Sequence, residues 1–173
     1  MTTQPRIIIT GFMCVGKTTV ARALAARLQC VWLDLDEFIA AREGRTVPAI
    51  INEDGEAHFR EIETAALALA LTTDARIIAL GGGAWPIARN RALVAHHDCI
   101  TVWLDAPFEL CWQRITNDAS VRPLAPDPVA ARSRYDERRM YYQLAQHHVS
   151  AAQSVDEIAA EILIRLEEAT GTG

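Results

Sequence analysis

The strongest chemical signal in the sequence is a glycine-rich loop, GFMCVGKT, from Gly11 to Thr18. Its spacing matches the phosphate-loop pattern, in which backbone N–H groups and a helix N-terminus surround the phosphates of a nucleotide. Lys17 would reach the β- and γ-phosphates, and the Thr18 hydroxyl would bind Mg²⁺. A glycine-rich turn with a chance lysine is the alternative. The apolar run before the loop and the helical pattern after it favour the phosphate site.

Two carboxylates end the next apolar segment, VWLDLD, at residues 31–36. If this segment is a strand, alternation places Asp34 and Asp36 on one face, at the end that borders the ligand crevice of an open α/β sheet. There they would assist a metal ion and accept a proton from an attacking hydroxyl. The alternative is that either aspartate caps the helix of DEFIAAREG, because aspartate is a favoured N-cap residue.

Further along the chain, an arginine and three glycines favour an anionic acceptor. Arg60 and Glu63 lie one helical turn apart in HFREIE, where a partly buried arginine suits a substrate carboxylate. An ordinary surface ion pair is the alternative. Gly81, Gly82 and Gly83 follow a predicted strand and would let the backbone approach a ligand closely, whereas a plain tight turn needs fewer glycines.

Six arginines lie between residues 114 and 139, partly in a stretch rich in Pro, Asp, Ser and Arg at 115–135. Loops of this composition late in a compact domain are usually lids or disordered segments. Arg122, in the segment RPL, would close over the transferred phosphate and neutralise charge in the transition state. A solvated basic face is the alternative, which we assign to Arg132 and Arg134. A nucleic-acid patch is disfavoured because no aromatic residues are interleaved.

The elements that must position these residues alternate between strand and helix patterns. Strands are expected at 6–10, 31–36, 75–80, 99–105 and 147–151. Helices are expected at 18–29, 55–71 and 87–95, from Pro107 onward, and after a capping box of Ser154 and Glu157. This alternation predicts a mainly parallel sheet with helices on both faces.

Length and composition are those of one soluble domain. The chain has 173 residues and a net charge of −5, which argues against a general nucleic-acid binder. Its four cysteines form no CxxC pair, which suits reduced thiols. The sequence has neither a signal-peptide pattern nor an apolar stretch long enough to span a bilayer. We therefore expect a cytoplasmic monomer without membrane or nucleic-acid partners.

Five segments resemble the shikimate kinase family in order and spacing: GFMCVGKTT, LDLDEFI, GEAHFREIE, the GGG of LGGGAW, and VRPL. The likeness covers about residues 6 to 166. It implies a three-layer α/β/α fold with a five-stranded parallel sheet, as a single P-loop kinase domain over 1–173. It also implies an acceptor-binding region near 35–62 and a lid near 115–130. The implied reaction transfers the γ-phosphate of ATP, with Mg²⁺, to the 3-hydroxyl of shikimate on the route to aromatic amino acids.

The resemblance implies roles for residues at matching positions. The catalytic residues would be Lys17, Asp34 and Arg122, with the metal at Thr18 and Asp34. The nucleotide would be bound by Gly11, Cys14, Val15, Gly16, Lys17, Thr18, Thr19 and Arg114, the last stacking on adenine. The acceptor would be bound by Asp36, Arg60, Gly81, Gly82, Gly83 and Arg138, with Glu63 orienting Arg60.

Three departures from the family pattern raise specific questions. Cys14 replaces a usual loop glycine, where a side chain would crowd the phosphates unless the local dihedrals are right-handed; we expect the loop to close on the phosphates. Leu35 separates the two aspartates and should point to the opposite face. The segment ERRMYY lacks the family's proline and leaves the second carboxylate-binding position open among Glu137, Arg138 and Arg139.

Two other functions stay open at this stage. A kinase for another small hydroxylated metabolite, such as a sugar acid, would account for the irregular ERRMYY segment. A nucleotide-binding module without catalysis would account for Cys14. Turnover with shikimate separates both from the implied reaction.

Overall fold

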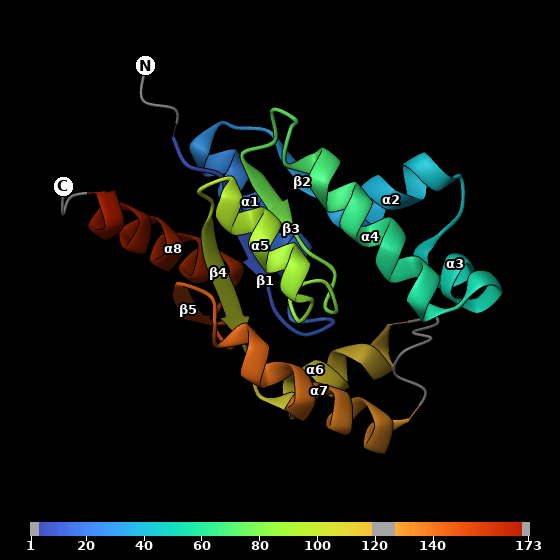
Figure 1. Ribbon diagram of the computed structural model, residues 1–173. Helices are drawn as coiled ribbons and strands as arrows, with labels where there is room; N and C mark the ends of the chain where they lie inside the picture. The colour runs from blue at the N-terminus through green and yellow to red at the C-terminus, as the bar shows by residue number, and fades with distance from the viewer. Residues whose placement is uncertain (1–3, 119–126, 171–173) are drawn as a thin grey trace.

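Five short apolar segments pair in parallel to form one sheet in the order β2-β3-β1-β4-β5 (Figure 1). The structure is a computed structural model that describes residues 4–118 and 127–170. The strands are β1 (Ile7–Thr10), β2 (Trp32–Asp34), β3 (Ile77–Ala79), β4 (Ile100–Asp105) and β5 (His147–Ser150). The predicted five-stranded parallel sheet is confirmed, although every strand is shorter than expected.

Helices cover both faces of the sheet. Figure 1 shows α5 in front of the sheet and α1 behind it, where α1 packs against α8. The predicted three-layer α/β/α arrangement is therefore confirmed. The helices among the described residues are α1 (Lys17–Leu28), α2 (Leu35–Glu43), α3 (Val47–Asp54), α4 (Glu56–Ala70), α5 (Ala88–His96), α6 (Phe108–Asn117), α7 (Pro128–Tyr142) and α8 (Val155–Thr170).

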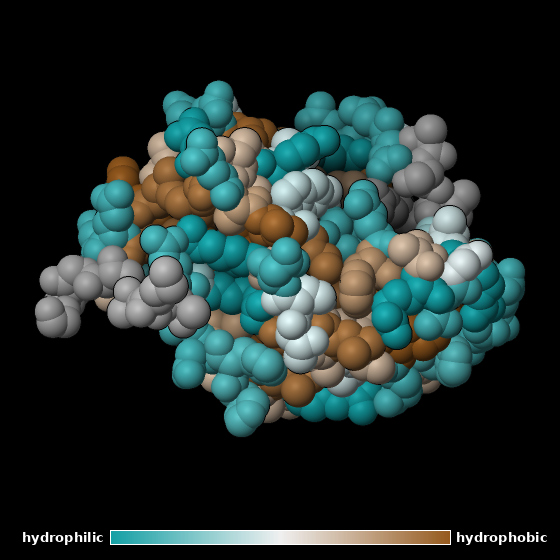
Figure 2. Space-filling view, turned by 90° about the horizontal axis from the view of Figure 1, so that it is seen from above, coloured by the Kyte–Doolittle hydropathy of each residue, from teal (hydrophilic) through white to brown (hydrophobic). Residues whose placement is uncertain are grey.

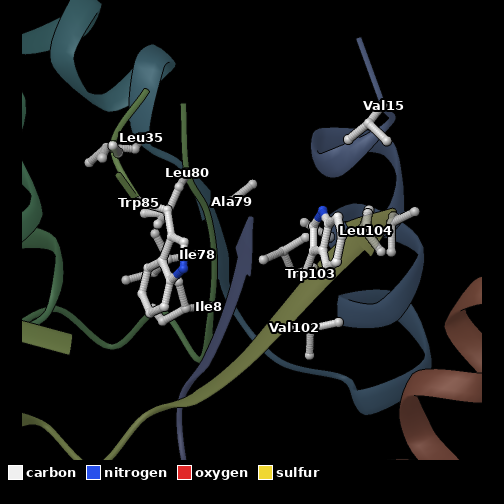
Figure 3. Close-up of a cluster of buried hydrophobic side chains, with 14 of the residues drawn as sticks. Ile8, Val15, Leu35, Ile78, Ala79, Leu80, Trp85, Val102, Trp103 and Leu104 are labelled. Atoms are coloured by element: carbon white, nitrogen blue, oxygen red, sulfur yellow. The ribbon is translucent and has the colours of Figure 1, made fainter. Parts of the chain in front are cut away.

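The core lies between the sheet and these helices. All four residues of β1 are buried, because a central parallel strand is covered on both faces and so needs a continuous apolar run. Ile8 pairs in register with Ile78 of β3, and Figure 3 shows these side chains close to Leu80 and Trp85. Trp85 is buried in this core, and its indole N–H donates to the Tyr141 carbonyl at 3.0 Å.

The surface is mixed in character. On the face that Figure 2 shows, hydrophobic residues form small groups between hydrophilic ones. In the ranges that the structure describes, no helix is long and apolar enough to cross a membrane.

The prediction of a strand through residue 36 is wrong. β2 ends at Asp34, whose side chain accepts a hydrogen bond from the backbone N–H of Glu37 at 3.1 Å and so caps α2. Asp36 therefore lies in the first turn of a helix and does not share a strand face with Asp34. Leu35 is fully buried in the core. The helix-capping alternative is the one that holds, because this hydrogen bond satisfies an N–H group that the helix itself leaves unpaired.

Two further segments differ from expectation. The short helix α3 was not predicted; it begins after Thr46, whose side chain accepts from Ala49 N at 3.3 Å. The ends of the expected lid at 115–130 are helical, since α6 continues to Asn117 and α7 starts at Pro128. The lid residue Arg122 lies outside the described residues.

The parallel sheet brings the predicted site residues to one edge. The loop after β1, the start of α2 after β2 and the three glycines after β3 all follow the carboxyl ends of neighbouring strands. In open α/β sheets this edge is where ligands bind.

Candidate active site

The loop between β1 and α1 is held in a tight turn by contacts that require glycine at its first position. Gly11 has φ +149°, and a Cβ there would lie 2.7 Å from the backbone oxygen of Leu104. Because that oxygen belongs to the neighbouring strand β4, it has little freedom to move away. The loop thus reaches α1 with its N–H groups near the helix N-terminus, an arrangement suited to anions.

Lys17 begins α1 and folds back over the loop. Its ammonium group donates to the carbonyls of Gly11 at 2.9 Å and Phe12 at 2.8 Å. Burial lowers the pKa of Lys17 to about 8, although the nearby carboxylates of Asp36 and Asp34 oppose this shift. The ammonium is therefore already placed among the loop's own carbonyls, beside the space that a phosphate would fill.

Cys14 adopts the left-handed conformation, with φ +59°. The right-handed dihedrals that would keep this side chain from crowding the phosphates are therefore absent at Cys14. A non-glycine residue in this region costs about 1–2 kcal/mol. Arg114 supports the turn, since its Nη1 donates to the carbonyls of Cys14 at 3.3 Å and Val15 at 3.0 Å. The backbone here has the left-handed conformation that favours glycine, even though the residue is a cysteine.

Thr18 and Asp34 form the second polar group of the loop. The Thr18 hydroxyl donates to Asp34 Oδ2, while Asp34 Oδ1 caps α2. The aspartate is thus fixed by both of its oxygens. A hydroxyl and a carboxylate next to a phosphate site are the hard oxygen donors that Mg²⁺ prefers, so these two residues fit that ion.

A cavity of about 430 Å³ opens above the loop. It is lined by loop residues from Met13 to Thr19, by Asp34 and Asp36, and by Arg114. Sequence reasoning missed the wall on the other side, which the turn after β5 and the start of α8 supply: Ala151, Gln153, Val155 and Ile158. These residues are small, amide or aliphatic, and nothing in their pattern indicates a ligand.

A second cavity of about 310 Å³ adjoins the first. It lies between α2, α3, α4, the three glycines and α7. Its charged lining residues are Asp36, Glu37, Arg60, Glu63 and Arg138. The two cavities share four lining residues: Met13, Asp36, Gly81 and Gly82. Asp36 thus stands at the junction where contents of the two cavities would meet.

Arg60 and Glu63 form a buried pair at the wall of this second cavity. Arg60 Nη1 donates to Glu63 Oε2 at 2.7 Å, and the Arg60 side chain is 15% exposed, whereas Glu63 is fully buried. Burial raises the pKa of Glu63 to about 7; the guanidinium of Arg60 opposes the shift and Asp36 adds to it. The surface ion pair that was the alternative for this segment is thus excluded.

Gly81 and Gly83 leave room for charged side chains. A Cβ on Gly83 would lie 2.1 Å from Nη2 of Arg60, so any larger residue would displace this guanidinium. A Cβ on Gly81 would lie 2.8 Å from Asp36 Oδ1 and 3.0 Å from Glu63 Oε1. The nearest side-chain atom to a Cβ on Gly82 would be Nη1 of Arg138, at 3.5 Å. The glycine run is therefore more than a tight turn, because it lets Asp36, Glu63 and Arg60 approach one stretch of backbone closely.

Arg138 is the residue of ERRMYY that lines the second cavity. It is 7% exposed, and burial lowers the pKa of its guanidinium, an effect to which the neighbouring Arg60 adds. Glu137 is exposed, and Arg139 points elsewhere to pair with Asp105 at 2.7 Å. A buried arginine near other arginines favours an anion in the adjoining space.

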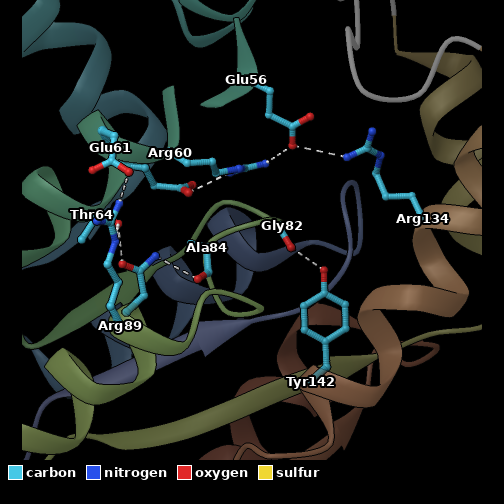
Figure 4. A network of polar contacts seen from close by, with 11 residues as sticks. Glu56, Arg60, Glu61, Thr64, Gly82, Ala84, Arg89, Arg134 and Tyr142 are labelled. Carbon is cyan, nitrogen blue, oxygen red and sulfur yellow. Dashed lines mark hydrogen bonds and ion pairs between the residues drawn. The ribbon is translucent and has the colours of Figure 1, made fainter. Parts of the chain in front are cut away.

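A further ion pair joins α4 to α7 through Glu56, which also pairs with Arg60 (Figure 4). Glu56 Oε1 of α4 accepts from Arg60 at 3.1 Å and from Arg134 of α7 at 3.4 Å. The assignment of Arg134 to a solvated basic face is thus wrong, because α7 turns this side chain toward α4. Arg132 does lie on an exposed face, where it pairs with Glu109 and Asp136.

Comparisons with known proteins agree with this geometry. The family model described as shikimate kinase matches residues 13–167. The chain is 40% identical over 169 residues to the shikimate kinase of Salinibacter ruber, covering 91% of this chain and 82% of that protein. It is 35% identical over 164 residues to that of Aquifex aeolicus, covering 94% and 96%.

Solved structures show the same relationship. Shikimate kinase from Acinetobacter baumannii in complex with shikimate superposes with a TM-score of 0.89 at 34% identity, covering 96% of this chain and 94% of that one. A gluconokinase from Sinorhizobium meliloti superposes with a TM-score of 0.64 over 95% and 93% of the chains. At 17% identity, the second likeness shows the fold alone.

Proposed function

This chain belongs to the shikimate kinase family, and we propose that its two adjoining cavities bind ATP and shikimate for direct phosphoryl transfer. The activity is ATP-dependent phosphorylation of the 3-hydroxyl of shikimate, a transfer to an alcohol group in aromatic amino-acid biosynthesis. One observation carries the assignment of the cavities. They share Asp36, Gly81 and Gly82, so a donor phosphate and an acceptor hydroxyl would meet at these residues.

The cavity above the loop is proposed for the nucleotide. Backbone N–H groups of Gly11 and of residues 14–19 would surround the phosphates, and Lys17 would move from the loop carbonyls to the β- and γ-phosphates. Arg114, which lines this cavity while holding the loop, would stack on the adenine of the nucleotide. Thr18 and Asp34 would hold Mg²⁺, which, when bound, neutralises charge on the phosphates.

The second cavity is proposed for the acceptor. Arg60 and Arg138 would bind the shikimate carboxylate from two sides, because a guanidinium fork suits a carboxylate and both cations already face this cavity. Glu63 would keep Arg60 in place through their 2.7 Å contact. Glycines 81–83 would let the ring of the acceptor lie close to the backbone.

Asp36 is proposed as the proton acceptor. The 3-hydroxyl oxygen would attack the γ-phosphorus in line, the bond to the bridging oxygen would break, and ADP would leave. The hydroxyl proton would pass to Asp36, which stands at the junction of the cavities. Asp34 is less suited to this step because its two oxygens bind Thr18 and the α2 N-terminus. Arg122 is proposed to neutralise transition-state charge.

We also propose that the protein acts as a cytoplasmic monomer on small molecules, without nucleic-acid or membrane partners. The net charge of −5 disfavours a nucleic-acid partner, because a phosphate backbone is itself negatively charged. Light scattering coupled to size-exclusion chromatography tests whether the protein is a monomer in solution.

A coupled assay of ADP release tests the function. With ATP and Mg²⁺ present, shikimate should support steady turnover, and gluconate and simple polyols should not. Faster turnover with gluconate would reassign the acceptor cavity to a sugar acid. ATP binding without turnover of any of these acceptors would favour a non-catalytic module.

A further inference from the structure

Two neighbouring arginines of α7 point in different directions. Arg138 is buried and lines the acceptor cavity, whereas Arg139 points away from it. Successive residues of an α-helix project about 100° apart, so a small rotation of α7 about its axis would move Arg138 out of the cavity. Something must therefore fix the rotation of this helix.

Arg139 makes the contact best suited to that task. Its guanidinium binds Asp105 through two hydrogen bonds, from Nη1 at 2.7 Å and from Nη2 at 3.1 Å. The guanidinium also lies over the ring of Trp103, with Cζ of Arg139 5.0 Å from the ring centroid. A two-pronged bond combined with stacking restricts the orientation of the guanidinium far more than a single ion pair does.

Asp105 and Trp103 are rigid partners because they belong to the sheet. Both lie on β4, and the carbonyl of Asp105 accepts from Ala151 N at 2.7 Å beyond β5. Tyr135, one turn before Arg139, joins the same contact: its hydroxyl accepts from Arg139 at 2.9 Å and donates to Ala106 O at 2.7 Å. α7 is thus tied to the end of β4 through two of its own turns.

The end of α7 is also tied to the glycine run. The Tyr142 hydroxyl donates to the carbonyl of Gly82, as Figure 4 shows, and Tyr142 is almost fully buried. Along α7, Arg138 lies between Tyr135 and Tyr142, which make these attachments to Ala106 and Gly82, and it directly precedes Arg139. The side chain that faces the acceptor is therefore held at the point where the helix is best anchored.

We propose that the Arg139–Asp105 pair positions Arg138 by setting the rotation of α7, and so determines affinity for the acceptor without touching it. This inference rests on the proposed role of Arg138 in binding the acceptor carboxylate. Among the described residues that line the two cavities, neither Arg139 nor Asp105 is found. Both side chains are about one-third exposed, so the pair adds little to stability and its main contribution is geometric.

Steady-state kinetics of Arg139→Gln and Asp105→Asn, with each substrate varied, test the proposal. We expect the KM for shikimate to rise about fivefold to tenfold and the KM for ATP to stay within about twofold, since the coupling of neighbouring groups is of this order. Arg139→Lys, which keeps the charge but loses the fork, should lie between. Arg132→Gln, on the exposed face of the same helix, is the matched control and should change neither KM.

A double-mutant cycle separates positioning from general damage. If Arg139 acts through Arg138, then Arg139→Gln should add almost nothing to the KM for shikimate once Arg138→Ala is present. Equal effects in both backgrounds, equal rises in both KM values, or no change in the single variants would each overturn the proposal. Absence of turnover by the wild-type protein would instead overturn the proposed function, so the two failures are distinguishable.

Discussion

The protonation state of Lys17 changes with pH in the range where this residue is proposed to bind phosphate. Its ammonium is enclosed by the loop, and burial lowers its pKa to about 8 despite Asp36 and Asp34. Phosphate favours the protonated form. As pH rises through about 8, the free protein loses this proton, so ATP binding must take it up again.

We therefore predict that ATP affinity falls above pH 8. The Kd for ATP should rise by up to about tenfold per pH unit between pH 8.5 and 9.5, because one proton is linked to binding. Calorimetric titrations from pH 7 to 9.5 measure this. Lys17→Arg keeps its charge over the whole range and should give a flat profile. The same slope in both proteins would assign the titration to another group.

The raised pKa of Glu63 predicts that the free energy of unfolding depends on pH. Burial raises its pKa from 4.5 to about 7, so the folded protein holds this proton more tightly than the unfolded chain. The stability from this group is therefore complete below about pH 4.5 and is lost as pH rises through about 7. Glu63→Gln removes the titration. Relative to this variant, the wild-type free energy of unfolding should fall by roughly 3 kcal/mol between pH 4.5 and 8.

Urea unfolding at several pH values measures this difference. The Arg60–Glu63 charge pair exists only where Glu63 is ionised, so its effect is already contained in the pKa of Glu63. Replacing the neutral carboxyl by an amide gives a constant offset, and only the change with pH tests the prediction. Glu43→Gln, at an exposed position of α2, is the control and should follow the wild type. A difference between wild type and Glu63→Gln that is independent of pH would show that Glu63 titrates alike in the folded and unfolded chain.

Among the elements, α8 is the one whose start was predicted from a local pattern. Ser154 Oγ accepts from Glu157 N at 3.3 Å, and Glu157 Oε2 accepts from Ser154 N at 2.9 Å, so the expected capping box is present. Ser154→Ala should lower the free energy of unfolding by about 1 kcal/mol, since one helix N–H loses its partner. Urea titration measures it. Ser133→Ala, at an exposed position inside α7, should cost almost nothing; equal costs would exclude the cap as the cause.

Elements were predictable where a pattern has one structural solution. The long amphipathic pattern of α4 and the mainly apolar run of β1 each allow one, and the structure places their ends within one residue of the expected positions. VWLDLD allows two, because aspartate both ends strands at a crevice and caps helices. The choice depends on a hydrogen bond from Glu37 N to Asp34. The alternation of apolar and polar residues along the chain does not predict this bond.

The same distinction applies to the candidate site. The phosphate loop, Arg60 with Glu63, and the three glycines carry their chemistry in adjacent residues, so the sequence predicted their positions. Whether Arg138 or Arg139 faces the acceptor cavity depends on how α7 is rotated against β4. Asp105, which is 34 residues from Arg139 in the sequence, controls this rotation. Ala151 and Val155 line the nucleotide cavity through their position alone and carry no chemical signal.

At the scale of the whole molecule, the acceptor cavity is assembled from separate parts of one chain. α2, α3 and α4 supply one wall, the turn after β3 supplies the floor, and α7 supplies the opposite wall. α3 and α4 pack on each other and on α2, which continues directly from β2. We therefore predict that the acceptor region unfolds together with the sheet as a single domain.

Ligand-dependent thermal unfolding tests this. Shikimate at about 100 times its Kd should stabilise the protein by about 2.7 kcal/mol, which for a domain of this size raises Tm by roughly 5–10 °C in one transition. Arg60→Ala removes one side of the proposed carboxylate site and should abolish the shift by shikimate while leaving a shift by ATP. Arg132→Ala, on the exposed face of α7, should keep both. Two transitions, of which shikimate moves one, would show instead that the acceptor region folds separately from the nucleotide site.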